Sequence, residues 1–119
     1  MVSISKDTAY YVRINNDYEL ELLCSYLNTK FPRKFRWCSD RDIIVKEITK
    51  DYIKKICNYK RQTLRLDRDY RFTYASMIHY NIGDIDSSGN KVISVYDLEG
   101  IGDLANSARK KQDILSWIK

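Results

Sequence analysis

A β-rich run that leads directly into a capped helical pattern is the feature that most constrains the fold. Thr8–Asn15 is rich in Tyr, Val and Ile, which favour strands. Asn16 follows as a helix N-cap, with Glu19 three residues later in a variant of the capping box. Phe31-Pro32 ends the helix, because the residue before proline avoids the α region. The expected inward face of this helix has spacing i, i+3, i+4, i+7: Leu20, Leu23, Cys24 and Leu27.

The next part of the chain continues this alternation of strand and helix patterns. Short strands are predicted over Lys34–Cys38 and Asp42–Ile48. A helix is predicted over about Lys50–Arg61, with Thr49 as its cap. Leu64–Asp69 is predicted as a connection or a short edge strand.

The last part of the chain is predicted as a hairpin and a helix. Arg71–Ile82 and Lys91–Leu98 are the expected strands, and the turn cluster Asp86–Asn90 joins them. Gly100 and Gly102 interrupt the chain before a helix over about Asp103–Ile118. The apolar face of this helix is either core or a dimer seam, which leaves a homo-oligomer open.

The order of these elements defines the expected fold class. The chain has one proline, four glycines and no linker among its 119 residues, so we expect a single domain covering residues 1–119. Strands and helices in this order predict an α+β fold. We expect a mostly antiparallel sheet of about four to six strands with three helices.

Positive charge is concentrated in the middle third of the chain. Residues 30–71 hold fourteen basic and six acidic residues, a net charge of +8, whereas the whole chain has a net charge of +5. Such a segment suggests an anionic partner: nucleic acid, an acidic protein face or anionic lipid. A solvated, lysine-rich helix and loop explains the pattern equally well, because acidic residues interrupt the run.

Aromatic residues alternate with the basic ones in this segment. Single-stranded nucleic acid is held by a cationic groove together with aromatic platforms for the bases. The segment lacks the aromatic motif of RNA-recognition sheets, the GxxG clamp and a helix-turn-helix. The predicted binding residues, for nucleic acid or an acidic partner, are Arg33, Lys34, Arg36, Trp37, Arg41, Lys54, Lys55, Lys60, Arg61, Arg65, Arg68 and Arg71.

The ten tyrosines are equally suited to a protein-binding surface. Tyr and Arg are favoured residues at protein interfaces. Four tyrosines lie outside the basic segment and are predicted as interface candidates: Tyr10, Tyr11, Tyr18 and Tyr26.

The sequence offers no pattern for catalysis, a metal or a cofactor. The three cysteines, Cys24, Cys38 and Cys57, form no CxxC pair, so a zinc site is not expected. His79 has no identifiable nucleophile and orienting carboxylate, so no catalytic residue is assigned. Asp84-x-Asp86-x-Ser88-Gly89 matches the opening of a calcium-binding EF-hand loop, but its twelfth position is Val95. We therefore predict a hairpin turn there.

The chain shows no sign of export or of a membrane partner. Its start, MVSISKDTAY, has no apolar signal region. No apolar run approaches the roughly 20 residues that span a bilayer. The expectation is a cytoplasmic protein with reduced thiols.

The stretch AYYVRINNDYELELLCSYL, followed by KFRWCS, resembles small bacteriophage or prophage accessory proteins. The resemblance covers roughly the first third of the chain. Proteins of that kind are commonly non-enzymatic binders of host enzymes or defence complexes, including CRISPR inhibitors. Many such inhibitors are acidic mimics of nucleic acid, and this basic chain departs from that pattern.

These features support three hypotheses. The first, implied by the resemblance, is a small non-enzymatic protein of phage or mobile-element type in the host cytoplasm. It would modulate or inhibit a host protein or protein–nucleic-acid complex by surface contact. The alternative is a module that binds DNA or RNA through residues 30–71. An enzyme ranks third, because the sequence offers one histidine, no metal cluster and no nucleotide loop.

Overall fold

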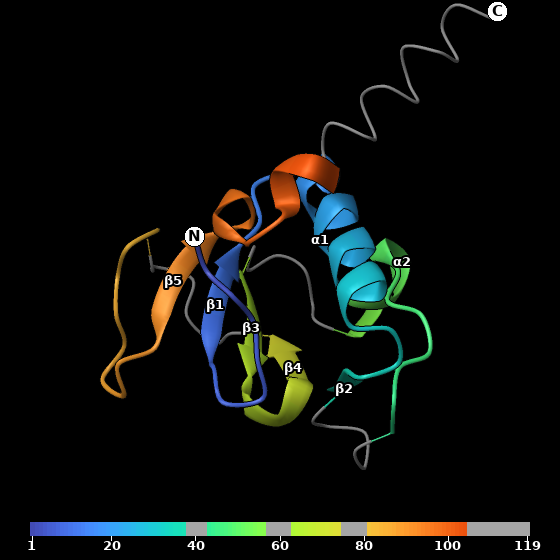
Figure 1. The fold of residues 1–119 in the computed structure, drawn as a ribbon, viewed down its shortest axis with the longest axis horizontal. Coiled ribbons are helices and arrows are strands. Elements are labelled where there is room, and N and C mark those ends of the chain that lie inside the picture. Colours follow the sequence, from blue (N-terminus) through green and yellow to red (C-terminus); the bar gives the residue numbers. More distant parts are fainter. Residues whose placement is uncertain (38–42, 57–62, 75–80, 105–119) are drawn as a thin grey trace, which may run out of the picture.

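The computed structural model describes residues 1–37, 43–56, 63–74 and 81–104 (Figure 1). Besides the helices and strands, two short 3₁₀ segments occur at Arg68–Tyr70 (η2) and Val95–Asp97 (η3), and residues 101–104 form a helical turn. The fold is α+β, as the sequence predicts. Its helices and strands are β1 (Tyr10–Arg13), α1 (Asp17–Lys30), β2 (Arg36–Trp37), α2 (Lys50–Ile56), β3 (Thr63–Asp67), β4 (Arg71–Tyr74) and β5 (Lys91–Ser94).

The sheet is mixed, so the expectation of a mostly antiparallel sheet is wrong. Its five strands have the order β2-β4-β3-β1-β5. β3 pairs antiparallel with β1 and with β4, whereas β1–β5 and β2–β4 are parallel pairs. Parallel neighbours need a crossover through other elements, and local sequence does not reveal such pairings.

In the described residues, the run predicted over Arg71–Ile82 does not pair with Lys91–Leu98, and its residues 75–80 lie outside the described part of the chain. β4 pairs with β3 and β2, and β5 pairs with β1 instead. β3 lies in the middle of the sheet rather than at its edge, with Leu64 and Leu66 buried. The three-residue segment η2 returns the chain directly from β3 to β4, which makes β3–β4 an antiparallel hairpin.

Several predicted elements are shorter in the structure. The expected strand over Asp42–Ile48 is reduced, in its described part, to a single bridge between Ile44 and Arg36. β2 begins at Arg36, two residues after its predicted start, and most of the predicted run after Tyr74 of β4 lies outside the described residues. The ends of the helices predicted over Lys50–Arg61 and Asp103–Ile118 lie outside the described residues.

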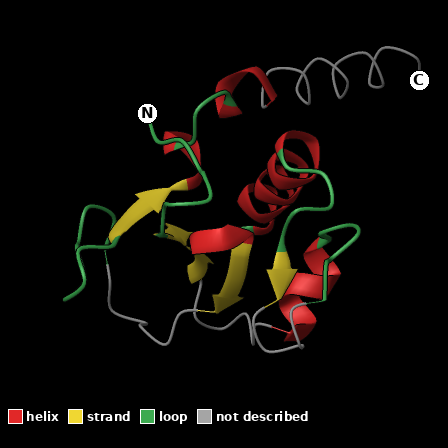
Figure 2. Cartoon of the chain, turned by 60° about the horizontal axis from the view of Figure 1, so that its bottom comes forward, coloured by secondary structure: helices red, strands yellow, loops and turns green. Residues whose placement is uncertain are grey.

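Local signals correctly place helix α1. Asn16 caps it, since the Asn16 side chain accepts a hydrogen bond from the Glu19 backbone at 2.8 Å. The Glu19 carboxylate in turn accepts a hydrogen bond from the Asn15 backbone at 3.2 Å. α1 and α2 lie close together on one side of the sheet (Figures 1 and 2). The apolar residues between helices and sheet form the core, which includes Leu23, Leu27 and Ile53.

The turn that includes residues 86–90 forms as predicted, and Asp86 organises it. One Asp86 oxygen accepts from the backbone of Ser88 and Asn90, both at 2.8 Å. The other accepts from the Tyr11 hydroxyl at 2.8 Å and the Asn90 amide at 3.1 Å. These bonds, the Asn90 backbone bond foremost, lower the pKa of Asp86 to about 2. Asp86 thus binds its own loop and Tyr11 of β1.

Because of this turn, we expect the stability of the fold to depend on pH in the acid range. The folded-state pKa of Asp86 lies below its ordinary value of 3.8. Its carboxylate therefore stabilises the fold above that value, and this contribution is lost as the pH falls through about 2. The melting temperature of Asp86→Asn should lie below that of the unmodified protein near neutral pH, with the gap closing in acid. A gap that stays constant with pH would contradict this role.

Candidate anion-binding face

One face of the sheet packs on the helices, and the other carries arginines. Side chains alternate between faces along a strand. In β4, Phe72 is buried in the core, so Arg71 lies on the opposite face. The register places Arg36 of β2 and Asp67 of β3 directly opposite Arg71, on either side of it. Arg36, Arg71 and Asp67 therefore form a row across three strands.

The next rows add two more arginines. Arg65 of β3 stands opposite Tyr11 of β1, and Arg13 of β1 stands opposite Thr63. Asp67 is the single carboxylate among the described strand residues, and it lies 3.5 Å from Arg65. Four arginines of the strands meet the carboxylate of Asp67 and, beside Tyr11, that of Asp86, so the face keeps an excess of positive charge. We call Arg13, Arg36, Arg65 and Arg71 the arginine face; all four side chains are half-buried.

At the β2 end of this face lies a hollow of about 320 Å³, which we call the basic hollow. The Asp69 backbone amide donates a hydrogen bond of 2.8 Å to the Lys6 carbonyl. This bond ties the N-terminal segment to η2, so Lys6 lies beside the β2 and β4 strands. The lining residues are Lys6, Arg36, Asp69, Tyr70 and Arg71.

The basic hollow has an excess of positive charge. Its three cations and one carboxylate give a net charge of +2. Within the described part of the chain, neither Lys6 nor Arg36 forms an ion pair. Arg36 and Arg71 are direct partners on neighbouring strands, and like charges in that position are unfavourable. Asp67 stands opposite Arg71 on its other side, and a bound anion would add to the neutralisation that this carboxylate provides.

The backbone at the hollow is unusual. Asp69 and Tyr70 have φ values of 59° and 55°, a region that residues other than glycine rarely adopt. Packing holds Tyr70 there, because its ring centroid lies 5.5 Å from that of Phe31 and 5.7 Å from that of Phe35. The Lys34 ammonium lies 5.4 Å from the same ring. Such strained positions often occur at binding sites.

The structure separates the other predicted basic residues from this face. Lys54 of α2 pairs with Asp17 of α1 at 2.9 Å, which lowers the pKa of Asp17. Lys55 is exposed on α2. Arg33 and Arg68 are exposed in connecting segments, near the ends of α1 and β3 respectively. The predicted residues Arg41, Lys60 and Arg61 lie outside the described residues.

Trp37 lies in the core rather than in the basic surface. Its side chain is only 6% exposed, and its ring centroid lies 5.4 Å from that of Phe72. β2 places Trp37 and Arg36 on opposite faces of the sheet. A nucleic-acid base cannot stack on a ring buried in this way, so the aromatic-platform role has no support from Trp37.

The four candidate interface tyrosines do not share a surface. Tyr10 packs against the core, whereas Tyr11 faces the other side of the sheet and is 3% exposed. Tyr26 is also 3% exposed, and its hydroxyl donates to the Glu99 carbonyl at 2.8 Å. Tyr18 on α1 is the most accessible, at 39%. They therefore do not act together as a docking face.

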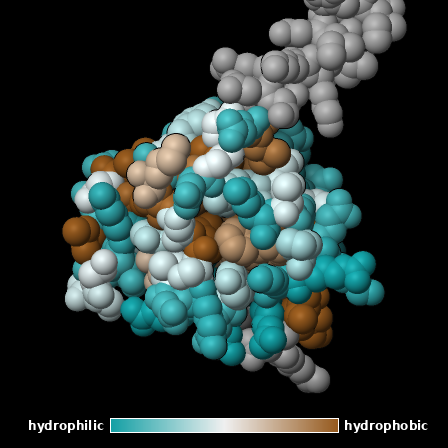
Figure 3. All heavy atoms as spheres, viewed as in Figure 1, coloured by the Kyte–Doolittle hydropathy of each residue, from teal (hydrophilic) through white to brown (hydrophobic). Residues whose placement is uncertain are grey.

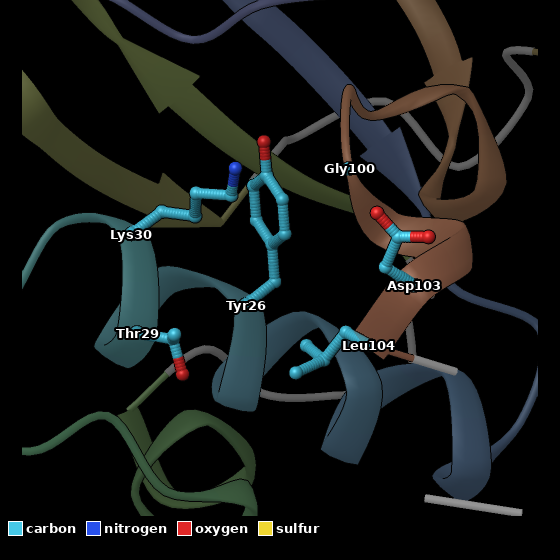
Figure 4. Close-up of a pocket in the computed structure, with 6 residues that line it drawn as sticks. All are labelled: Tyr26, Thr29, Lys30, Gly100, Asp103 and Leu104. Atoms are coloured by element: carbon cyan, nitrogen blue, oxygen red, sulfur yellow. The ribbon is translucent and has the colours of Figure 1, made fainter. Parts of the chain in front are cut away.

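Tyr26 lines a second hollow, of about 250 Å³, between α1 and residues 100–104. Figure 4 shows Tyr26 and Lys30 of α1 opposite Asp103 and Leu104. Gly100 has a φ of 84°, and a Cβ there would lie 2.9 Å from the Lys30 ammonium. This close approach explains why a glycine occupies position 100. The charged residues that line the second hollow are one cation, Lys30, and one carboxylate, Asp103.

Sequence reasoning missed two members of the positive surface. Lys6 and Arg13 lie outside the basic segment of residues 30–71, in a stretch whose net charge is negative. Side chains alternate between the two sheet faces along a strand, so the predicted strand Thr8–Asn15 could have placed Arg13 on the face opposite to that of Val12. Nothing local indicates Lys6, because the long-range bond to Asp69 brings it to the site.

The rest of the described chain offers little other chemistry. Burial raises the pKa of the Cys24 thiol to about 12, so it stays protonated. Within the described residues, no three potential metal ligands cluster, and no helix has the length and apolarity to cross a membrane. No protein-family model matches the chain, and comparisons with curated proteins and with solved structures find no match.

Proposed function

We propose that the protein is a non-enzymatic module that binds nucleic acid through its arginine face and basic hollow. The observation that carries this proposal is the direct pairing of Arg36 with Arg71 beside Lys6. Guanidinium groups bind phosphate oxygens through two parallel hydrogen bonds. The phosphates of nucleic acid supply such anions at regular spacing along a strand.

The arrangement favours contact with the phosphate backbone over base recognition. The buried position of Trp37 removes one predicted stacking platform. Phosphate contacts fix the position of a protein on nucleic acid without reading its sequence. The expected binding therefore has little sequence preference and depends strongly on salt.

Fluorescence anisotropy with labelled single- and double-stranded oligonucleotides tests this proposal. Each phosphate contact contributes roughly 0.7 to 0.9 to the slope of log affinity against log salt. Engagement of three or four cations should therefore give a slope of about −2 to −3.6. A slope near zero, or no binding even at low salt, would contradict the proposal.

A second candidate is docking on a host protein or protein–nucleic-acid complex, as in the phage-type hypothesis. The observation in its favour is a mixed apolar and basic surface beside β2. Ile43 and Ile44 are 58% and 44% exposed, and Ile44 forms a bridge with Arg36. Figure 3 shows a hydrophobic patch near the position of β2, among hydrophilic residues. Absence of nucleic-acid binding at low salt would favour this candidate.

A further inference from the structure

The positively charged side chains of the basic hollow lie close together rather than along a strip. Lys6, Arg36 and Arg71 come from three separate segments, yet they line one hollow of about 320 Å³. A groove that follows a nucleic-acid backbone has its cations spread along a strip. Three cations around one hollow suit a single, highly charged group instead.

The net charge of the hollow matches a phosphate monoester. The three cations and Asp69 give +2. A phosphodiester carries one negative charge, whereas a monoester carries about −1.5 to −2 at neutral pH, because its second pKa is near 6. Asp69 also disfavours a second anion in the same space. A monoester therefore neutralises the hollow more completely than a diester does.

The geometry supplies suitable donors. Arg36 and Arg71 lie side by side on parallel strands, so their guanidinium groups approach one phosphate from neighbouring positions. Each presents a planar fork of N–H groups that fits phosphate oxygens. Lys6 adds a flexible ammonium from the N-terminal segment. The Asp69 backbone amide fixes this segment by its hydrogen bond to the Lys6 carbonyl.

We propose that the basic hollow binds the terminal phosphate of a nucleic-acid strand. This inference rests on the proposed nucleic-acid binding and adds a preference for phosphorylated ends. The same chemistry occurs in a free nucleoside monophosphate, so the experiment must separate the two sources. The strand is the expected source because half-buried Arg65 of β3 continues the arginine face from the hollow toward Tyr11, whose side chain is covered.

Anisotropy competition with one oligonucleotide sequence in three forms tests the proposal: 5′-phosphorylated, 3′-phosphorylated and unphosphorylated. At least one phosphorylated form should bind about tenfold more tightly than the unphosphorylated form, the scale of one charge-assisted hydrogen bond. The preference should shrink below about pH 6, where the monoester loses its second charge. Adenosine monophosphate should compete only weakly, because it lacks the strand.

Two variants with the same change in charge make the assignment specific. Arg36→Gln should reduce the preference to within about twofold, because it removes one fork from the hollow. Lys55→Gln on α2 should keep the preference, since Lys55 is exposed and does not line the hollow. Circular dichroism would establish that both variants fold.

The outcomes separate this inference from the proposed function. Equal binding of all three oligonucleotides would overturn the terminal-phosphate site while leaving nucleic-acid binding intact. Competition by adenosine monophosphate as strong as by the phosphorylated strand would overturn the strand as its source. No binding of any oligonucleotide would overturn both proposals.

Discussion

The double substitution Lys6→Glu and Arg36→Glu is expected to weaken nucleic-acid binding about a hundredfold at low salt. It changes the net charge of the basic hollow from +2 to −2. The salt dependence should flatten at the same time, because fewer counterions are released when fewer phosphates are contacted. Anisotropy titrations at two salt concentrations would measure both effects.

The fold should tolerate this change. Arg36 faces Arg71 across β2 and β4, so a glutamate at position 36 replaces a like-charge pair with an opposite-charge pair. Opposite pairs on neighbouring strands contribute roughly 0.2–1 kcal/mol. Arg36→Glu alone should therefore melt at the same temperature as the unmodified protein or slightly higher. If a variant keeps its melting temperature but no longer binds, unfolding does not explain the loss of binding.

A matched charge reversal completes the comparison. Lys55→Glu alters the net charge of the whole protein by the same amount as either single reversal, but it lies on α2, away from the hollow. It should weaken binding by no more than about threefold through long-range electrostatics. Equal losses for Lys55→Glu and Arg36→Glu would mean that only overall charge matters and that the hollow is not the site.

Local sequence signals predict the individual elements well where the interactions are local. The cap of α1 depends on Asn16 and Glu19, three residues apart, and the structure contains it as predicted. The turn around Asp86 likewise depends on bonds within five residues. In both cases the residues that define the structure are neighbours in the chain, so their pattern is visible in the sequence.

Strand pairing is harder to predict, because it depends on distant partners. The alternation of Leu64 and Leu66 with Arg65 and Asp67 is the pattern of a strand with one buried face. From the sequence we nevertheless expect a connection or a short edge strand over Leu64–Asp69. The structure places β3 centrally, since its two leucines cover the core while its charged residues occupy the opposite face.

The candidate site was predictable only in part. Arg36, Arg65 and Arg71 belong to the basic segment, but the sequence does not show that they share one sheet face. That depends on the β2–β4 and β3–β4 registers. Lys54 shows the opposite case, because an apparent surface cation pairs with Asp17 of α1. Composition reveals the excess of charge, whereas topology decides which charges can act together.

Replacing Trp37 with alanine is expected to destabilise the fold by about 3–5 kcal/mol, the usual cost of removing a large buried aromatic side chain. The side chain is 6% exposed and packs on Phe72, which itself packs on Phe35 and Tyr52. Removing the indole would leave a cavity beside these rings. Urea denaturation followed by circular dichroism would measure the change in the free energy of unfolding.

Trp37→Phe separates this structural role from a direct role in binding. Phenylalanine keeps an aromatic ring in the cavity, so the loss of stability should be smaller than for alanine. Nucleic-acid affinity should stay within about twofold of the unmodified protein, because position 37 faces the core while Arg36 faces the hollow. A folded Trp37→Phe variant with affinity reduced about tenfold would instead indicate that the indole contacts the ligand. The arginine face would then account for only part of the binding surface.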